Sequence, residues 1–237
     1  MYSQSINAIL SAARSLLRSR RVLLMLIAAY ACLLLAIYLF VSTREATISQ
    51  LILTLVAVVS APALFFALQA ISVSYPDGTA SRGLLQKSLK LIAVSVPVVA
   101  LTLLTIYGLN KIHSHPTIVT AVRYLLLAVV IPLLAIHLWI AGSNSGFRVF
   151  VKNLRKVLSN TFAPHSVFVY ACGFLFFAVV PYYLLQGKTS IQRPWLELSL
   201  LFLRLGVSAM LILIGWVTTV GAISILTRKN YLAATKN

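Results

Sequence analysis

The chain has 237 residues, of which 60% are hydrophobic and only 10% are charged, and its formal net charge is +17. A soluble domain carries roughly 25% charged and about 45–50% apolar residues, so this composition excludes an ordinary soluble domain. The apolar residues gather in runs of about 20, long enough to cross a hydrocarbon core of about 30 Å. Because the positive charges lie between these runs, we expect them to meet an anionic membrane surface and not a nucleic acid.

The first segment, residues 5–21, has the pattern of an amphipathic helix that lies in the membrane interface. Its apolar residues recur at helical spacing and define one face: Ile6, Ile9, Leu10, Ala13, Leu16 and Leu17. A signal peptide would have an apolar core of only about 7–15 residues and a cleavage site with small residues. We therefore expect this segment to lead, uncleaved, into a first spanning helix.

Six apolar runs predict an all-α polytopic membrane protein with six transmembrane helices in a single domain over residues 1–237. The expected spans are 22–41, 48–73, 91–109, 118–141, 165–186 and 198–226. After the second span, Tyr75-Pro-Asp-Gly78 predicts a tight turn, because proline presets one backbone angle and glycine permits another. Basic segments precede three of the spans, so amphipathic interfacial segments are expected before helices one, three and five.

The three basic segments suggest an internal repeat. Leu10, Leu84 and Leu154 occupy comparable places in them, and Tyr30-Ala-Cys32 matches Tyr170-Ala-Cys172 at a distance of 140 residues. A parallel repeat of three helical hairpins would explain both observations. Chance similarity in apolar sequence is the alternative.

The orientation follows from the distribution of lysine and arginine. The side that holds both termini carries 14 of these residues and the opposite side carries 4. By the positive-inside rule both termini are expected in the cytoplasm, and the membrane is expected to be the inner membrane of a bacterium. In the third basic segment, Arg148, Lys152, Arg155 and Lys156 are expected to act as interfacial anchors.

Arg123 and Arg204 are the basic residues that fall within spans. An arginine at mid-bilayer costs at least ~2.5–3.5 kcal/mol, so such a residue often marks a functional site. Both arginines, however, lie near the outer end of a span, where the guanidinium can reach the interface. The sharper alternative is a pocket for an anionic lipid headgroup, formed by the two arginines with Glu197.

Catalytic and metal-binding patterns are not found in the sequence. His113 and His115 form an H-x-H pair, but no third ligand lies near them in sequence, so no metal site is expected. The chain has three carboxylates, too few for a proton relay or a two-carboxylate hydrolase. We expect no enzymatic activity and no cofactor. Pro62, Pro97, Pro132 and Pro181 lie inside spans, and kinked helices around a cavity are one reading of them; the general frequency of proline in membrane helices is the other.

Three segments resemble a broad group of bacterial six-helix membrane proteins, which includes the membrane domain attached to some glycerophosphodiester phosphodiesterases. These segments are SAARSLLRSRRVLLML, SRGLLQKSLKLIAVSVP and VKNLRKVLSNTFAPHSVFVY. The resemblance lies in layout and implies the six-helix fold. It implies no activity, because the chain contains no phosphodiesterase domain.

Two functions are compatible with these features. The preferred expectation is a non-enzymatic membrane protein that organises or senses the membrane or serves as an accessory subunit. The alternative is a permease for a small or lipidic solute, which the proline-bearing helices would favour. The expected partners are anionic headgroups on the cytoplasmic side, and a second copy or other membrane subunits are further candidates.

Overall fold

The computed structural model describes residues 2–43, 47–80, 83–111, 116–144, 154–187 and 193–233, and every element in these ranges is helical. Six helices are long and apolar enough to cross a membrane: Arg20–Ser42, Ile48–Asp77, Leu84–Asn110, Thr117–Ser143, Pro164–Gln186 and Pro194–Thr227. This confirms the all-α fold and places six apolar helices where the sequence predicts spans. Each helix extends beyond its predicted range at one or both ends.

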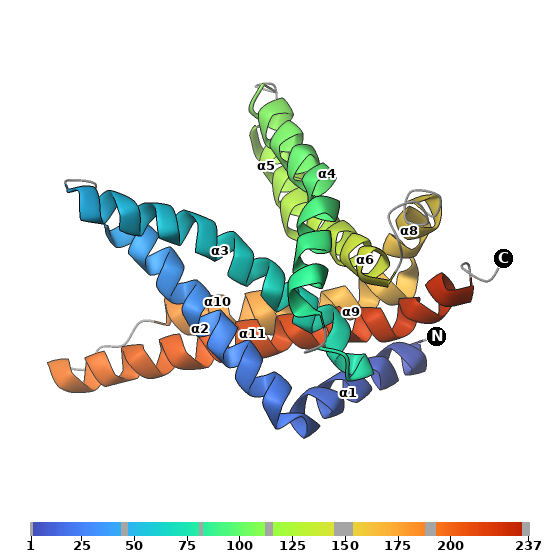
Figure 1. Cartoon of the computed structure of the whole chain (residues 1–237), viewed down its shortest axis with the longest axis horizontal. Helices are drawn as coiled ribbons and strands as arrows, with labels where there is room; N and C mark the ends of the chain where they lie inside the picture. Colours follow the sequence, from blue (N-terminus) through green and yellow to red (C-terminus); the bar gives the residue numbers. More distant parts are fainter. Residues whose placement is uncertain are drawn as a thin grey trace.

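The six long helices pair as three hairpins whose tips point in different directions (Figure 1). In the first, α2 (Arg20–Ser42) packs against α3 (Ile48–Ser74). In the second, α4 (Leu84–Asn110) packs against a returning helix made of α5 (Pro116–Leu125), η2 (Leu126–Val130) and α6 (Ile131–Asn144). In the third, α9 (Pro164–Phe174), η3 (Leu175–Val179) and α10 (Val180–Gln186) pack against α11 (Pro194–Ala233).

The hairpins meet at one end only, in a region that we call the hub. The hub consists of α1 (Tyr2–Arg18), α6, α9 and those parts of α3, α4 and α11 that lie farthest from the hairpin tips. Burial follows this division. In α3, residues 68–74 are all buried whereas most of 48–59 is exposed, and in α11 burial is concentrated between 213 and 227. The tip halves of the helices therefore contact little of the chain beyond their own hairpin partner.

Polar side chains join helices within the hub. The indole of Trp139 donates to the Ser95 hydroxyl at 2.7 Å and joins α6 to α4 within the second hairpin. The indole of Trp216 donates to the Gln69 side-chain oxygen at 2.9 Å and joins the third hairpin to the first. Trp139 and Gln69 are only 5% and 3% exposed. Interhelical hydrogen bonds of this kind hold membrane helices together where lipid gives no hydrophobic driving force. Trp139, which has the sequence character of an interfacial aromatic residue, is thus a buried hub residue.

In two of the proline-bearing helices, the turn directly before the proline is π-helical, which is wider than an α-helical turn. The amide of Ile131 donates to the carbonyl of Leu126, and the amide of Val180 donates to that of Leu175, so each bond spans five residues. Pro132 and Pro181 follow immediately. A proline ring collides with the carbonyl four residues earlier and leaves it without an amide donor, and a π-helical turn accommodates the ring.

The carbonyl that Pro132 leaves without an amide donor belongs to Ala128, and it accepts a hydrogen bond from the Tyr170 hydroxyl at 2.6 Å. Tyr170 is 2% exposed and comes from the third hairpin, whereas Ala128 belongs to the second. A backbone carbonyl in hydrocarbon must find an internal donor. Tyr170 thus supplies the donor and joins two hairpins in the same contact.

The first predicted interfacial segment is a separate helix, α1, but its apolar residues form two faces where the sequence pattern predicts one. Small residues and Leu16 are buried against α9, α11 and the short helix η1 (Tyr75–Asp77); the small ones are Ser5, Ala8 and Ala12. Ile6, Leu10 and Leu17 are instead exposed. With Arg14 and Arg18 exposed on the third side, α1 presents one face to the hub, one suited to lipid and one suited to water and headgroups.

The other two predicted interfacial segments differ from each other. Before the fifth span, α8 (Leu154–Thr161) is separate because the chain turns at Ala163, ahead of Pro164. Before the third span the described basic residues lie within α4 itself, which begins directly after Gly83, with φ of 61°, and continues without a break through Leu91. Residues 84–90 contain no proline or glycine that would end a helix, and their place in the membrane interface stays a prediction. The turn predicted at Tyr75–Gly78 is confirmed, with Gly78 at φ of 69°.

Candidate functional site: two cavities along helix α11

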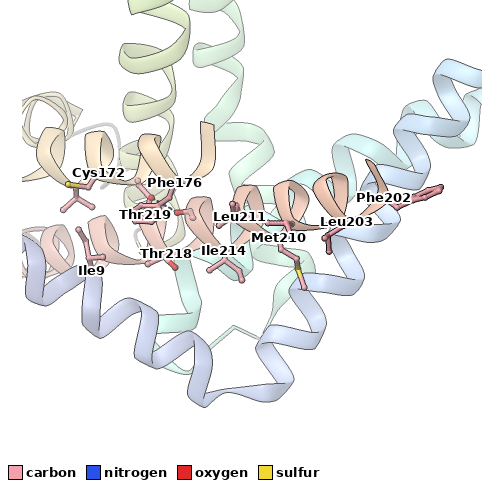
Figure 2. A pocket seen from close by; sticks show the side chains of 15 residues that line it. Ile9, Cys172, Phe176, Phe202, Leu203, Met210, Leu211, Ile214, Thr218 and Thr219 are labelled. Atoms are coloured by element: carbon pink, nitrogen blue, oxygen red, sulfur yellow. Dashed lines mark hydrogen bonds between the residues drawn. The ribbon is translucent and has the colours of Figure 1, made fainter. Parts of the chain in front are cut away.

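An apolar groove runs along α11, where this helix faces α9, η3 and α1 (Figure 2). Its volume is about 840 Å³. Apart from Thr218 and Thr219, its lining is made of apolar side chains and glycine, with Ile9 of α1 at one end and Phe202 near the tip of the third hairpin at the other. Phe176, Phe202 and Leu203 are each at least 60% exposed, so the groove is open towards the side where lipid would lie.

Glycine shapes the walls of this groove by close helix contact. A Cβ atom on Gly173 would lie 1.9 Å from the Thr219 hydroxyl oxygen, and one on Gly215 would lie 3.1 Å from the Cβ of Phe177. These two glycines let α9 and η3 approach α11 closely, as small residues do in membrane helix pairs. Gly206 also lines the groove, but a Cβ atom there would have nothing within 4 Å. The groove is therefore closed at its base and empty beside Gly206.

A second cavity, of about 570 Å³, lies at the tip of the third hairpin, between the end of α10 and the start of α11. It combines two charged side chains, Glu197 and Arg204, with leucines and a proline: Leu185, Leu198, Leu201 and Pro194. Arg204 is half-buried, and its guanidinium donates to the carbonyl of Gly187. This cavity is the place in the described part of the chain where two of the three residues of the predicted headgroup pocket meet.

Arg123, the third residue of that predicted pocket, lies elsewhere. It belongs to α5 in the second hairpin, and its guanidinium donates to the Asn110 side-chain oxygen at 2.7 Å. The tip of the second hairpin points away from that of the third (Figure 1). The structure thus places Glu197 and Arg204 in one cavity and Arg123 in another hairpin, where it links α5 to the end of α4.

The predicted interfacial anchors are only partly described. Arg155 and Lys156 lie in α8, whereas Arg148 and Lys152 fall outside the described residues, as do His113 and His115. Within the described ranges, no three side chains of His, Cys, Asp or Glu gather as metal ligands would. Helix α8 packs against α6 and α9, which places its basic residues at the hub end of the structure.

The groove was missed by the sequence reading, although a signal for it exists. The small residues of the sixth predicted span, Gly206 and Gly215 among them, predict close internal packing, and Gly215 does lie close to Phe177. What sequence alone could not reveal is that Gly206 lies beside open space. Comparisons of the chain with protein families, with curated proteins and with solved structures find no match, so the resemblance to six-helix membrane proteins rests on layout.

Proposed function

We propose that this chain is a non-enzymatic integral membrane protein that organises the membrane around it by holding phospholipids against α11. The observation that carries the proposal is the groove. Three hairpins are joined at the hub and diverge towards their tips. Along the third hairpin, beside α1, runs an apolar, open groove lined by α11, α9 and η3. Acyl chains are the occupants that such a surface fits inside a bilayer, because they satisfy apolar walls without requiring hydrogen bonds.

The proposed orientation places the hub in the cytoplasmic half of a bacterial inner membrane. Its support is the charge on the hub side: Arg14 and Arg18 in α1, Lys87 and Lys90 in the first turns of α4, and Arg155 and Lys156 in α8. We expect a fluorescent protein fused to the C-terminus to fluoresce, since it folds in the cytoplasm, and a fused alkaline phosphatase to stay inactive. Active phosphatase with a dark fluorescent fusion would reverse the orientation.

Filling the groove tests the function directly. Gly206→Leu places a side chain in the groove without a steric clash, because the space beside Gly206 is empty. We expect this variant to retain fewer phospholipids per protein than the wild type after purification in mild detergent, as counted by native mass spectrometry. Gly108→Leu is the matched control: a Cβ atom on Gly108 also has nothing within 4 Å, and this glycine lies in α4, away from the groove. Equal lipid retention in all three proteins would contradict the proposal.

A permease for a lipidic solute is the second candidate, and one observation favours it. The groove extends from Ile9 at the hub to Phe202 near a tip, which is the direction in which a lipid would have to travel between leaflets. In reconstituted vesicles, fluorescent phospholipid crossing faster than in protein-free vesicles, with the excess lost in Gly206→Leu, would establish transport. Lipid retention without faster crossing would favour the organising role.

A further inference from the structure

The cavity at the tip of the third hairpin supports a more specific inference, which rests on the proposed function. We propose that this cavity binds the headgroup of a zwitterionic phospholipid with a primary ammonium group, as in phosphatidylethanolamine, with the phosphate at Arg204 and the ammonium at Glu197. The groove would hold lipid through its chains alone, whereas this cavity would select lipid by headgroup.

The position of Arg204 suits it to receive a phosphate. A guanidinium has five N–H donors in a planar fork, and the Gly187 carbonyl takes one of the donors on a single terminal nitrogen. That contact orients the side chain at the cavity wall and leaves donors for a second acceptor. Arginine is well suited to phosphate because two parallel N–H groups can meet two phosphate oxygens.

Glu197 supplies the opposite charge at a fitting distance. It lies seven residues before Arg204, so both share one face of α11 at an axial separation of about 10 Å. Helical side chains lean towards the N-terminus of their helix, so both side chains lean the same way and the separation of about 10 Å between them is kept. That separation suits a phosphate and an ammonium joined by two carbons, each within hydrogen-bond reach of its partner. A purely anionic lipid would instead bring a negative charge towards Glu197 without any compensating cation.

The surroundings place the cavity at headgroup depth. Trp195 is 63% exposed in the first turn of α11, and Tyr182 and Tyr183 on α10 are 55% and 68% exposed. Exposed tryptophan and tyrosine mark the boundary between hydrocarbon and water in membrane proteins. Leu185, Leu198 and Leu201 complete the cavity wall and would meet the glycerol and the first methylenes of the acyl chains.

Lipid selectivity tests the inference. The full chain is purified from mixed micelles with equal amounts of phosphatidylethanolamine, phosphatidylcholine and phosphatidylglycerol, and bound lipids are identified by native mass spectrometry. Phosphatidylcholine is the decisive comparison, because its quaternary ammonium has no N–H to donate to a carboxylate. We expect the wild type to favour phosphatidylethanolamine over phosphatidylcholine roughly two- to fivefold, the range of a partly exposed ion pair.

Two variants distinguish the contribution of Glu197 from that of Arg204. Glu197→Gln should abolish the preference between phosphatidylethanolamine and phosphatidylcholine, and Arg204→Gln should lower the amount of both. Arg123→Gln is the matched control, since it removes an arginine near another hairpin tip and should leave the preference unchanged. An unaltered preference in Glu197→Gln, no preference in the wild type, or enrichment of phosphatidylglycerol that depends on Arg204 would each overturn the inference. If the wild type retains phospholipid that Gly206→Leu loses but shows no headgroup preference, the proposed function stands and this inference alone fails.

Discussion

Substituting Gly221 by valine is expected to destabilise the protein by roughly 1–3 kcal/mol, the cost of overpacking a filled site. A Cβ atom at this position would lie 2.2 Å from the Tyr75 hydroxyl oxygen and 2.6 Å from the adjacent ring carbon. Tyr75 cannot yield easily, since it is 3% exposed and its hydroxyl donates to the Ala12 carbonyl at 3.3 Å. The expected result is a lower midpoint of thermal unfolding in detergent, together with faster proteolysis of α1, because Tyr75 links that helix to the rest of the hub.

Gly206→Ala is a control for adding a side chain to a glycine of α11. It makes a glycine-to-alanine change in the same helix where the added methyl group meets nothing within 4 Å, so its stability should equal or slightly exceed that of the wild type through helix propensity. Replacing Tyr75 by leucine in the Gly221→Val background removes the hydroxyl and should make the double variant less destabilised than the sum of the two single ones. Additive losses would show that Gly221 and Tyr75 are not in contact.

The second large effect concerns the carbonyl of Ala128. Tyr170→Phe removes its donor and leaves a part-buried carbonyl unsatisfied beside Pro132, which should cost about 1–3 kcal/mol. Because proline creates the need for that donor, Pro132→Ala should reduce the cost of Tyr170→Phe by returning a backbone N–H to the helix. A double-mutant cycle of unfolding free energies measures this coupling.

Tyr183→Phe serves as the control for loss of a phenol hydroxyl, since Tyr183 is 68% exposed; it should change stability little. If Tyr170→Phe costs the same with and without Pro132, the hydroxyl does not compensate for the proline, and the wide turn at η2 needs another explanation. A cost close to that of Tyr183→Phe would show that the Ala128 carbonyl finds a different donor.

The helix positions were predictable because a span is specified by composition over some 20 residues, and few alternatives satisfy a bilayer. Helix ends were less predictable. Ser19, which separates α1 from α2 with backbone angles of −97° and 84°, is neither proline nor glycine, so its residue type does not mark the break. The face of α1 that meets the hub was also hidden, because Ala8 and Ala12 are small rather than strongly apolar and contribute little to a hydrophobic pattern.

The candidate site, too, was predictable from the sequence only in part. The spacing of Glu197 and Arg204 could be read from sequence, because seven residues on one helix return to the same face. The position of Arg123 could not, because it depends on the directions in which separate hairpins leave the hub. Those directions are set by contacts between distant residues, such as the hydrogen bonds from Trp216 to Gln69 and from Ser224 to the Val73 carbonyl, which bridge 147 and 151 residues of sequence.

The contact between α1 and α11 has a consequence for biogenesis. The face of α1 that carries Ser5, Ala8 and Ala12 is covered largely by α11, which the ribosome makes after all the other described helices. Each hairpin can insert as soon as it emerges, but α1 has its full packing surface only when α11 has entered the membrane. Assembly of the hub is therefore a post-insertion event, and until α11 arrives the nascent chain has a membrane-embedded but incompletely joined set of hairpins. During that interval, quality-control proteases that recognise unpaired membrane helices would be able to degrade the chain.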